Sequence, residues 1–149
     1  MTDSRHAQGL LDTNIIILRE WIDPDDLPDE MAISAVTLAE LSAGPHLVRS
    51  ADEDRGYAAA ERARRTEVLQ RAEAEFDPIP FGAEAARAYG RIVAAVAAHG
   101  RSPRRRVADQ QIAAISLAES LPLYTTNPDD YAGLDGLIAV VPVKRPATV

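Results

Sequence analysis

Cysteine is absent from the 149-residue chain, which excludes disulfide bonds and thiolate metal sites. The three histidines, His6, His46 and His99, are scattered without the spacing of a metal-binding motif. Any metal ion must therefore be held by oxygen ligands. No stretch approaches the roughly 20 apolar residues that a membrane-spanning helix requires, and residues 1–9 lack the apolar region of a signal peptide. We therefore expect a cytoplasmic protein with no membrane association.

Lysine is almost absent as well, because Lys144 is the only one and arginine carries nearly all the positive charge. The formal net charge is −7. Since sequence-independent affinity for nucleic acids comes from neutralising phosphates, an acidic domain is a poor general nucleic-acid binder. The charge does not exclude an enzyme whose acidic pocket attracts phosphate once divalent cations fill it.

The chain has the length and the 46% hydrophobic content of one domain with a substantial core. We expect a single domain over residues 1–149, with its core at about 9–143, a short polar N-terminus and a C-terminal tail. Short apolar runs alternate with longer helical patterns, which predicts an α/β fold. Several runs are apolar on consecutive residues, as is typical of parallel strands that are covered on both faces. The expected architecture is a three-layer α/β/α sandwich around a mostly parallel, five-stranded sheet.

The predicted strands are 9–12, 31–34, a weak one at 77–80, 123–126 and 138–143. The predicted helices are 14–20, 36–43, about 57–75, 84–98 and 107–120.

Four acidic residues occupy related places in this pattern. Asp12 ends the first predicted strand and Asp130 follows the fourth, Glu40 lies in the helix after the second strand, and Asp109 opens the helix that leads to the fourth. Because the carboxyl ends of parallel strands meet at one edge of a sheet, we expect these side chains to lie close together. Clustered carboxylates raise one another's pKa unless a cation joins them. Oxygen-only ligands select Mg²⁺, for which Mn²⁺ can substitute.

Each acid also has a purely structural interpretation as part of a helix start. Asp12 and Asp109 could be N-caps, Thr37 and Glu40 have the spacing of a capping box, and the sequence NPDD from Asn127 has the form of a helix start. Taken singly, the two interpretations are equally plausible. Four such acids at one sheet edge favour a functional site.

The four acidic segments are, in order, LDTN (11–14), SAVTLAEL (34–41), DQQIAA (109–114) and LYTTNPDDY (123–131). They resemble the four motifs of PIN-domain ribonucleases of the VapC type, the toxins of bacterial VapBC toxin–antitoxin pairs. The resemblance covers the chain from about 9 to 143. No single motif is specific, but the ordered set in a chain of this length is.

This resemblance implies a PIN-like fold and an Mg²⁺-dependent endoribonuclease that cleaves structured RNA such as tRNA or rRNA. It also implies neutralisation by a cognate VapB-like antitoxin. Together with an apolar groove that we expect near the long helices, it implies a homodimer. The implied catalytic and metal-binding acids are Asp12, Glu40, Asp109 and Asp130. The implied supporting polar residues of the cofactor site are Thr13, Asn14, Thr125 and Asn127.

Three details leave questions open. The spacing T-x-N-x-x-D points to Asp130 rather than Asp129 as the fourth acid. Tyr131 stands where Phe is common in the family, and Gln110–Gln111 is more polar than usual after the third acid. The run Arg104–Arg106 could contact RNA phosphates or form a solvated loop, with equal weight.

Two other functions remain compatible with the sequence. A phosphatase or phosphoryl-transfer domain would use Asp12 as a nucleophile, although such sites usually need a second acid two residues later, where Asn14 stands, and a late lysine. A non-catalytic interaction module would use the acids as caps and surface charge. The ribonuclease and the phosphatase both predict Mg²⁺ binding at the carboxylates, whereas the interaction module does not.

Overall fold

The computed structural model describes residues 6–49 and 55–147. Most of the predicted polar N-terminus and the last residues of the predicted tail lie outside this part. The described chain contains a sheet of four parallel strands in the order β2-β1-β3-β4. The strands are β1 (Gln8–Leu11), β2 (Glu30–Ala32), β3 (Leu123–Thr125) and β4 (Val140–Pro142).

The predicted helices all form, with limits close to those expected from their periodicity. They are α1 (Thr13–Leu18), α2 (Ala35–Ala43), α3 (Arg55–Glu75), α4 (Ala83–Ala98) and α5 (Val107–Glu119). A short 3₁₀ helix, η4 (Pro128–Tyr131), follows β3. No helix in the described ranges combines the length and apolarity needed to cross a bilayer.

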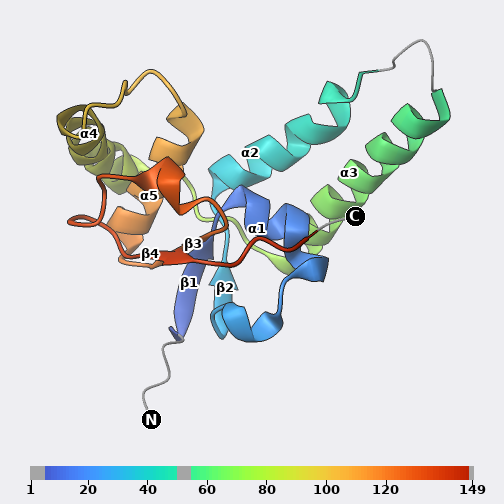
Figure 1. The fold of residues 1–149 in the computed structure, drawn as a ribbon, viewed down its shortest axis with the longest axis horizontal. Helices are drawn as coiled ribbons and strands as arrows, with labels where there is room; N and C mark the ends of the chain where they lie inside the picture. Colours follow the sequence, from blue (N-terminus) through green and yellow to red (C-terminus); the bar gives the residue numbers. More distant parts are fainter. Residues whose placement is uncertain (1–5, 50–54, 148–149) are drawn as a thin grey trace.

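The sheet separates two hydrophobic clusters, which confirms the predicted three layers. On β1, Leu10 packs into the cluster formed with α4 and α5, whereas Leu11 packs into the cluster formed with α1, α2 and α3. Leu123 and Tyr124 divide in the same way on β3. Successive side chains of a strand point to opposite faces, so both faces of these central strands are buried. Figure 1 shows α4 and α5 on one side of the sheet and the α2–α3 pair extending away from the other.

The predicted fifth strand at 77–80 was wrong as a strand. Only Ile79 pairs there, in an isolated parallel bridge with Ser34. Ile79 donates its backbone N–H to Ile33 and accepts from Ala35. The prolines on both sides, Pro78 and Pro80, have no N–H to extend the ladder.

Candidate active site

Asp12 lies directly after the central strand β1 and is almost fully buried, at 3% exposure. Its Oδ1 accepts a hydrogen bond from the backbone N–H of Thr13 (2.8 Å), and its Oδ2 accepts from the Thr125 hydroxyl (2.8 Å). Burial raises the pKa of Asp12, while the bonds from Thr125 and Thr13 lower it. Two donors, from β3 and from the start of α1, therefore hold the carboxylate in one orientation.

A chain of hydroxyl groups connects Glu40 to the same place. The Thr13 hydroxyl lies 2.6 Å from Glu40 Oε1 and 3.0 Å from the Thr37 hydroxyl, which in turn lies 3.4 Å from the Ser34 hydroxyl. An ionised Glu40 can only accept, so Thr13 donates to it and must accept from Thr37. The direction of donation is then Ser34 to Thr37 to Thr13 to Glu40. Sequence reasoning identified Thr13 but did not assign Ser34 and Thr37 to the site.

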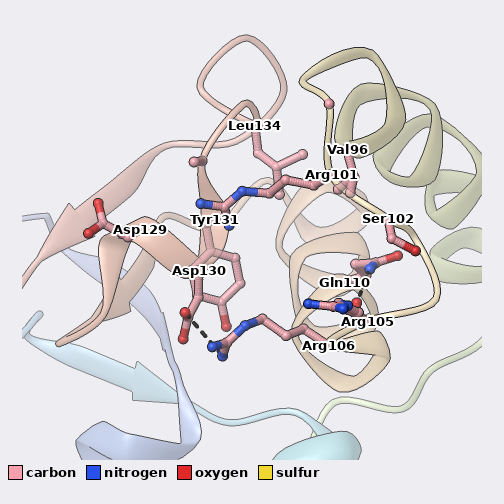
Figure 2. Close-up of a pocket in the computed structure, with 12 residues that line it drawn as sticks. Val96, Arg101, Ser102, Arg105, Arg106, Gln110, Asp129, Asp130, Tyr131 and Leu134 are labelled. Carbon is pink, nitrogen blue, oxygen red and sulfur yellow. Dashed lines mark hydrogen bonds and ion pairs between the residues drawn. The ribbon is translucent and has the colours of Figure 1, made fainter.

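The other two acids, Asp109 and Asp130, meet at the side chain of Arg106. Arg106 Nη1 lies 3.1 Å from Asp130 Oδ1 and 3.7 Å from Asp109 Oδ2. The two acidic side chains are about one-fifth exposed, whereas that of Arg106 is 61% exposed. Figure 2 shows Arg106 reaching from the start of α5 across to Asp130. An exposed arginine is thus the counter-charge on this side of the site.

The pKa of Asp109 depends on the charges of the other three acids, so the four acids lie close enough to interact electrostatically. Burial raises the pKa of Asp109 from 3.8 to about 7, with further increases from the charges of Asp12, Asp130 and Glu40, in that order, against a lowering by Arg106. Like charges at close range disfavour ionisation. The structure therefore brings together the four acids that the sequence singled out, and we call them the acidic site.

The hydroxyl of Tyr131 is a feature that the sequence did not anticipate. Tyr131 is 1% exposed, and its hydroxyl has no hydrogen-bond partner in the described structure. The hydroxyl lies near enough to Asp12 to lower the pKa of that carboxyl. Burial and the charges of Asp12 and Asp109 raise the pKa of Tyr131 well above its usual value. The Tyr131 hydroxyl is therefore a neutral group that lies beside the acids and can still donate a hydrogen bond.

Of the four helix-start interpretations, those of Asp12 and of the NPDD sequence at the start of η4 hold, and the other two do not. The N-cap of α2 is Ser34, which accepts from the Thr37 N–H, so Glu40 lies inside the helix and belongs to no capping box. The residue at the N-cap of α5 is Arg106, which places Asp109 in the first turn instead. Asp12 does cap α1. Capping therefore leaves the positions of Glu40 and Asp109 unexplained.

The supporting residues Thr13 and Thr125 take part in the site, whereas the asparagines contribute less. Asn127 donates its backbone N–H to the Thr125 hydroxyl (3.0 Å), and its side chain has only a long contact of 3.5 Å from Arg145. No side-chain hydrogen bond of Asn14 is found in the described chain.

Of the two adjacent acids, the structure brings Asp130 to the site. Its carboxylate faces Arg106, whereas Figure 2 shows the Asp129 carboxylate pointing away.

The acidic site fits a hard divalent cation in its chemistry. All of its charged ligand atoms are carboxylate oxygens, which Mg²⁺ prefers. Burial and repulsion from the other acids raise the pKa of Asp109. Within the described residues, no three acidic or histidine side chains are gathered closely enough to enclose an ion as they stand. Binding would thus require the carboxylates to move inward, and Asp109 and Asp130 would have to release Arg106.

Comparison with known proteins agrees with this architecture. The PIN domain family model matches residues 10–137. Because this match covers most of the chain, the α/β sandwich with its acidic sheet edge is a PIN domain, and the chain belongs to the PIN-domain family.

Its relatives place it among the VapC-type members. Ribonuclease VapC5 of Mycobacterium tuberculosis is 35% identical over 137 residues, which cover 90% of this chain and 93% of that protein. The crystal structure of VapBC-5 from the same organism, described as a member of the VapBC family of toxin–antitoxin systems, matches with a TM-score of 0.73 and 34% identity over 93% of this chain and 99% of that one. FitAcB of Neisseria gonorrhoeae matches with a TM-score of 0.62 and 26% identity over 88% and 94% of the two chains.

Proposed function

We propose that this protein is a divalent-metal-dependent endoribonuclease and the toxin of a VapBC-type pair, acting in the cytoplasm. The observation that carries the proposal is the grouping of Asp12, Glu40, Asp109 and Asp130 at one place, where burial and the charges of the other three acids raise the pKa of Asp109 to about 7. The name of its relative, Ribonuclease VapC5, supports RNA as the substrate. Structured RNA such as tRNA or rRNA is the class we propose.

In this mechanism the acids have unequal tasks. Asp12, held by Thr125 and Thr13, and Glu40, held by Thr13, are the two acids whose orientation is fixed by hydrogen bonds. Asp109 and Asp130 would complete the ligand set for Mg²⁺ or Mn²⁺ if Arg106 released them. The chemistry that such a cation supplies is a more acidic water and positive charge beside the phosphodiester.

The geometry disfavours a phosphatase with Asp12 as its nucleophile. Both oxygens of Asp12 already accept hydrogen bonds, and the side chain is 3% exposed. The single lysine, Lys144, is exposed beyond the end of β4. A nucleophilic carboxylate needs an oxygen that is free to attack phosphorus, and each Asp12 oxygen is already held by a hydrogen bond.

The test is cleavage of defined RNA transcripts by the wild type and by Asp109→Asn. We expect the wild type to cleave with Mg²⁺ or Mn²⁺ and to stop when EDTA is added. The variant should fold and should not cleave. Activity that survives EDTA, or a folded Asp109→Asn protein with wild-type activity, would overturn the proposal.

We also propose that a small VapB-like antitoxin neutralises the protein and that the chain forms a homodimer. The matched structures of VapBC-5 and of other VapBC complexes support the first point. A groove between α1, α2 and α3 is the place we propose for an antitoxin segment. Its lining includes the apolar side chains of Ile17, Leu41 and Val68 and the charged side chains of Glu40, Arg64 and Arg65. We expect growth arrest when the chain is expressed alone and a dimer by light scattering. A monomer without toxicity would contradict both.

A further inference from the structure

A cavity of about 650 Å³ lies beside the acidic site. One wall is the segment 99–106, which joins α4 to α5, and the opposite wall is η4 with the loop that follows it. The side chains of Arg101, Arg105 and Arg106 contribute to the lining, as Figure 2 shows. The volume falls within the range of about 300–1,000 Å³ that is typical of ligand pockets. We call this space the arginine cavity.

The charges in the arginine cavity are not balanced. Arg106 is paired with Asp130 and Asp109, so it belongs to both spaces. No carboxylate in residues 6–49 and 55–147 lies within ion-pair distance of Arg101 or Arg105. Asp129 also borders the cavity, but its carboxylate points away from the arginines (Figure 2). Two guanidinium groups are thus left without a partner in a chain of net charge −7.

The segment that carries these arginines is fixed by a buried side chain. Gln110 is 5% exposed, and its amide nitrogen donates to the backbone carbonyls of Pro103 (3.1 Å) and Arg105 (2.6 Å). Its amide oxygen is buried without a partner. Arg106 adopts a left-handed backbone conformation (φ +54°), which is uncommon for a residue other than glycine. Since Gln110 follows Asp109 directly, the first turns of α5 determine the positions of both the Asp109 carboxylate and the segment that carries the arginines.

The chemistry of the arginine cavity favours a phosphate group. The planar guanidinium fork matches two phosphate oxygens at once, so arginine is preferred where phosphates are recognised. A strand with one phosphodiester at the acidic site would carry its neighbouring phosphate past Asp130 and Arg106 toward this cavity. A local cationic site also explains how an acidic protein holds a polyanion.

We propose that Arg101 and Arg105 bind the phosphate of the nucleotide next to the cleaved phosphodiester, so that the arginine cavity is an RNA subsite. The inference rests on the proposed ribonuclease function. It assigns binding, and not chemistry, to the two arginines. Their loss should therefore raise KM and leave kcat nearly unchanged.

The test compares Arg101→Gln/Arg105→Gln with the control Arg87→Gln/Arg91→Gln, which makes the same charge change at exposed positions of α4 outside the cavity. We expect a rise in KM for RNA of about tenfold or more in the cavity variant only, with melting temperatures equal to wild type. Binding of a labelled single-stranded oligoribonucleotide, measured in an Asp109→Asn background, should lose roughly 0.7 from its log–log salt slope, the value expected for loss of one phosphate contact.

The possible failures are distinguishable. If the wild type cleaves RNA and the cavity variant matches the control in KM and salt slope, the subsite is refuted while the nuclease stands. If RNA binding is unchanged but affinity for the antitoxin falls, the arginines bind an acidic segment of that partner and the inference is equally refuted. If the wild type cleaves no RNA, the proposed function fails, and the binding measurement alone decides whether the cavity takes RNA.

Discussion

The two sides of the acidic site are held in place by different forces. On the side of β1 and α2, hydroxyl and backbone donors fix Asp12 and Glu40 by hydrogen bonds of 2.6–2.8 Å. On the side of α5 and η4, the exposed guanidinium of Arg106 is the partner that the described residues offer to the Asp109 and Asp130 side chains. The orientation of Asp12 and Glu40 therefore does not depend on which cations are in solution. The second side depends on charge, so it is the side that a cation can rearrange.

The largest effect is expected where the fixed side is broken. Asp12→Asn keeps the shape and can still accept from the Thr13 N–H, but it removes the buried negative charge. We expect RNA cleavage to fall by more than the roughly 10–100-fold that is typical of losing an outer-shell partner. Single-turnover cleavage measures this loss, and a wild-type melting profile serves as the folding control. A folded variant that retains a tenth of the activity would contradict the role of Asp12.

The charge-dependent side is tested by the pH dependence of stability. Because the pKa of Asp109 is raised from 3.8 to about 7 in the fold, ionisation costs stability progressively as pH rises from about 4 to 7. Asp109→Asn should therefore be more stable than wild type above pH 7, by at most about 4 kcal/mol, and equal to it near pH 4. Denaturant unfolding from pH 4 to 8 measures this difference. Asp129→Asn, which makes the same charge change at an exposed position beside Asp130, is the control.

A subtler change on the fixed side is the loss of one donor. Thr125→Val suits a β-strand but removes the hydroxyl that donates to Asp12 and accepts from the Asn127 N–H. We expect a 10–100-fold loss of cleavage and about 1–3 kcal/mol of destabilisation. Thr126→Val is the matched control, because the buried Thr126 hydroxyl has no partner to lose. Equal effects of the two substitutions would refute the preorganisation of Asp12.

The smallest effect is expected at Tyr131. Tyr131→Phe removes a buried hydroxyl that has no saturating partner, so stability should stay within about 1 kcal/mol of wild type. Since that hydroxyl lowers the pKa of Asp12, its loss should move the acidic limb of the pH–rate profile to higher pH. Cleavage near pH 8 should be unchanged. A shift to lower pH, or no shift, would remove Tyr131 from the site.

The fold was largely predictable because its signals are local. Consecutive apolar residues mark strands that are buried on both faces, and the start of α5 at Val107 agrees with its periodicity. The segment at 77–80 failed because β propensity says nothing of how many N–H groups can pair between two prolines. Whether a short apolar run becomes a strand is decided by its neighbours in space.

The sequence predicted which acids form the acidic site, but it did not predict the hydrogen bonds and ion pairs that orient them. Acids that follow strands reveal a shared sheet edge, so the four positions could be named from the sequence. Thr37 reaches Thr13, 24 residues earlier, only through the packing of α2 on α1. The pairing of Arg106 with Asp130 likewise depends on how η4 faces α5. Long-range contacts of this kind leave no periodic signal in one sequence.

The most direct test of the central claim, that the four acids form a cation site, is the melting temperature of wild type and Asp109→Asn at neutral pH with and without Mg²⁺ or Mn²⁺. A cation at a hundredfold its Kd stabilises the wild type by about 2.7 kcal/mol, which is a rise of several degrees at roughly 2–4 °C per kcal/mol. The account predicts that rise, a higher melting temperature for metal-free Asp109→Asn, and a smaller metal effect in the variant. The claim would be contradicted if millimolar Mg²⁺ or Mn²⁺ left the wild-type melting temperature unchanged and Asp109→Asn melted at a lower temperature than the wild type.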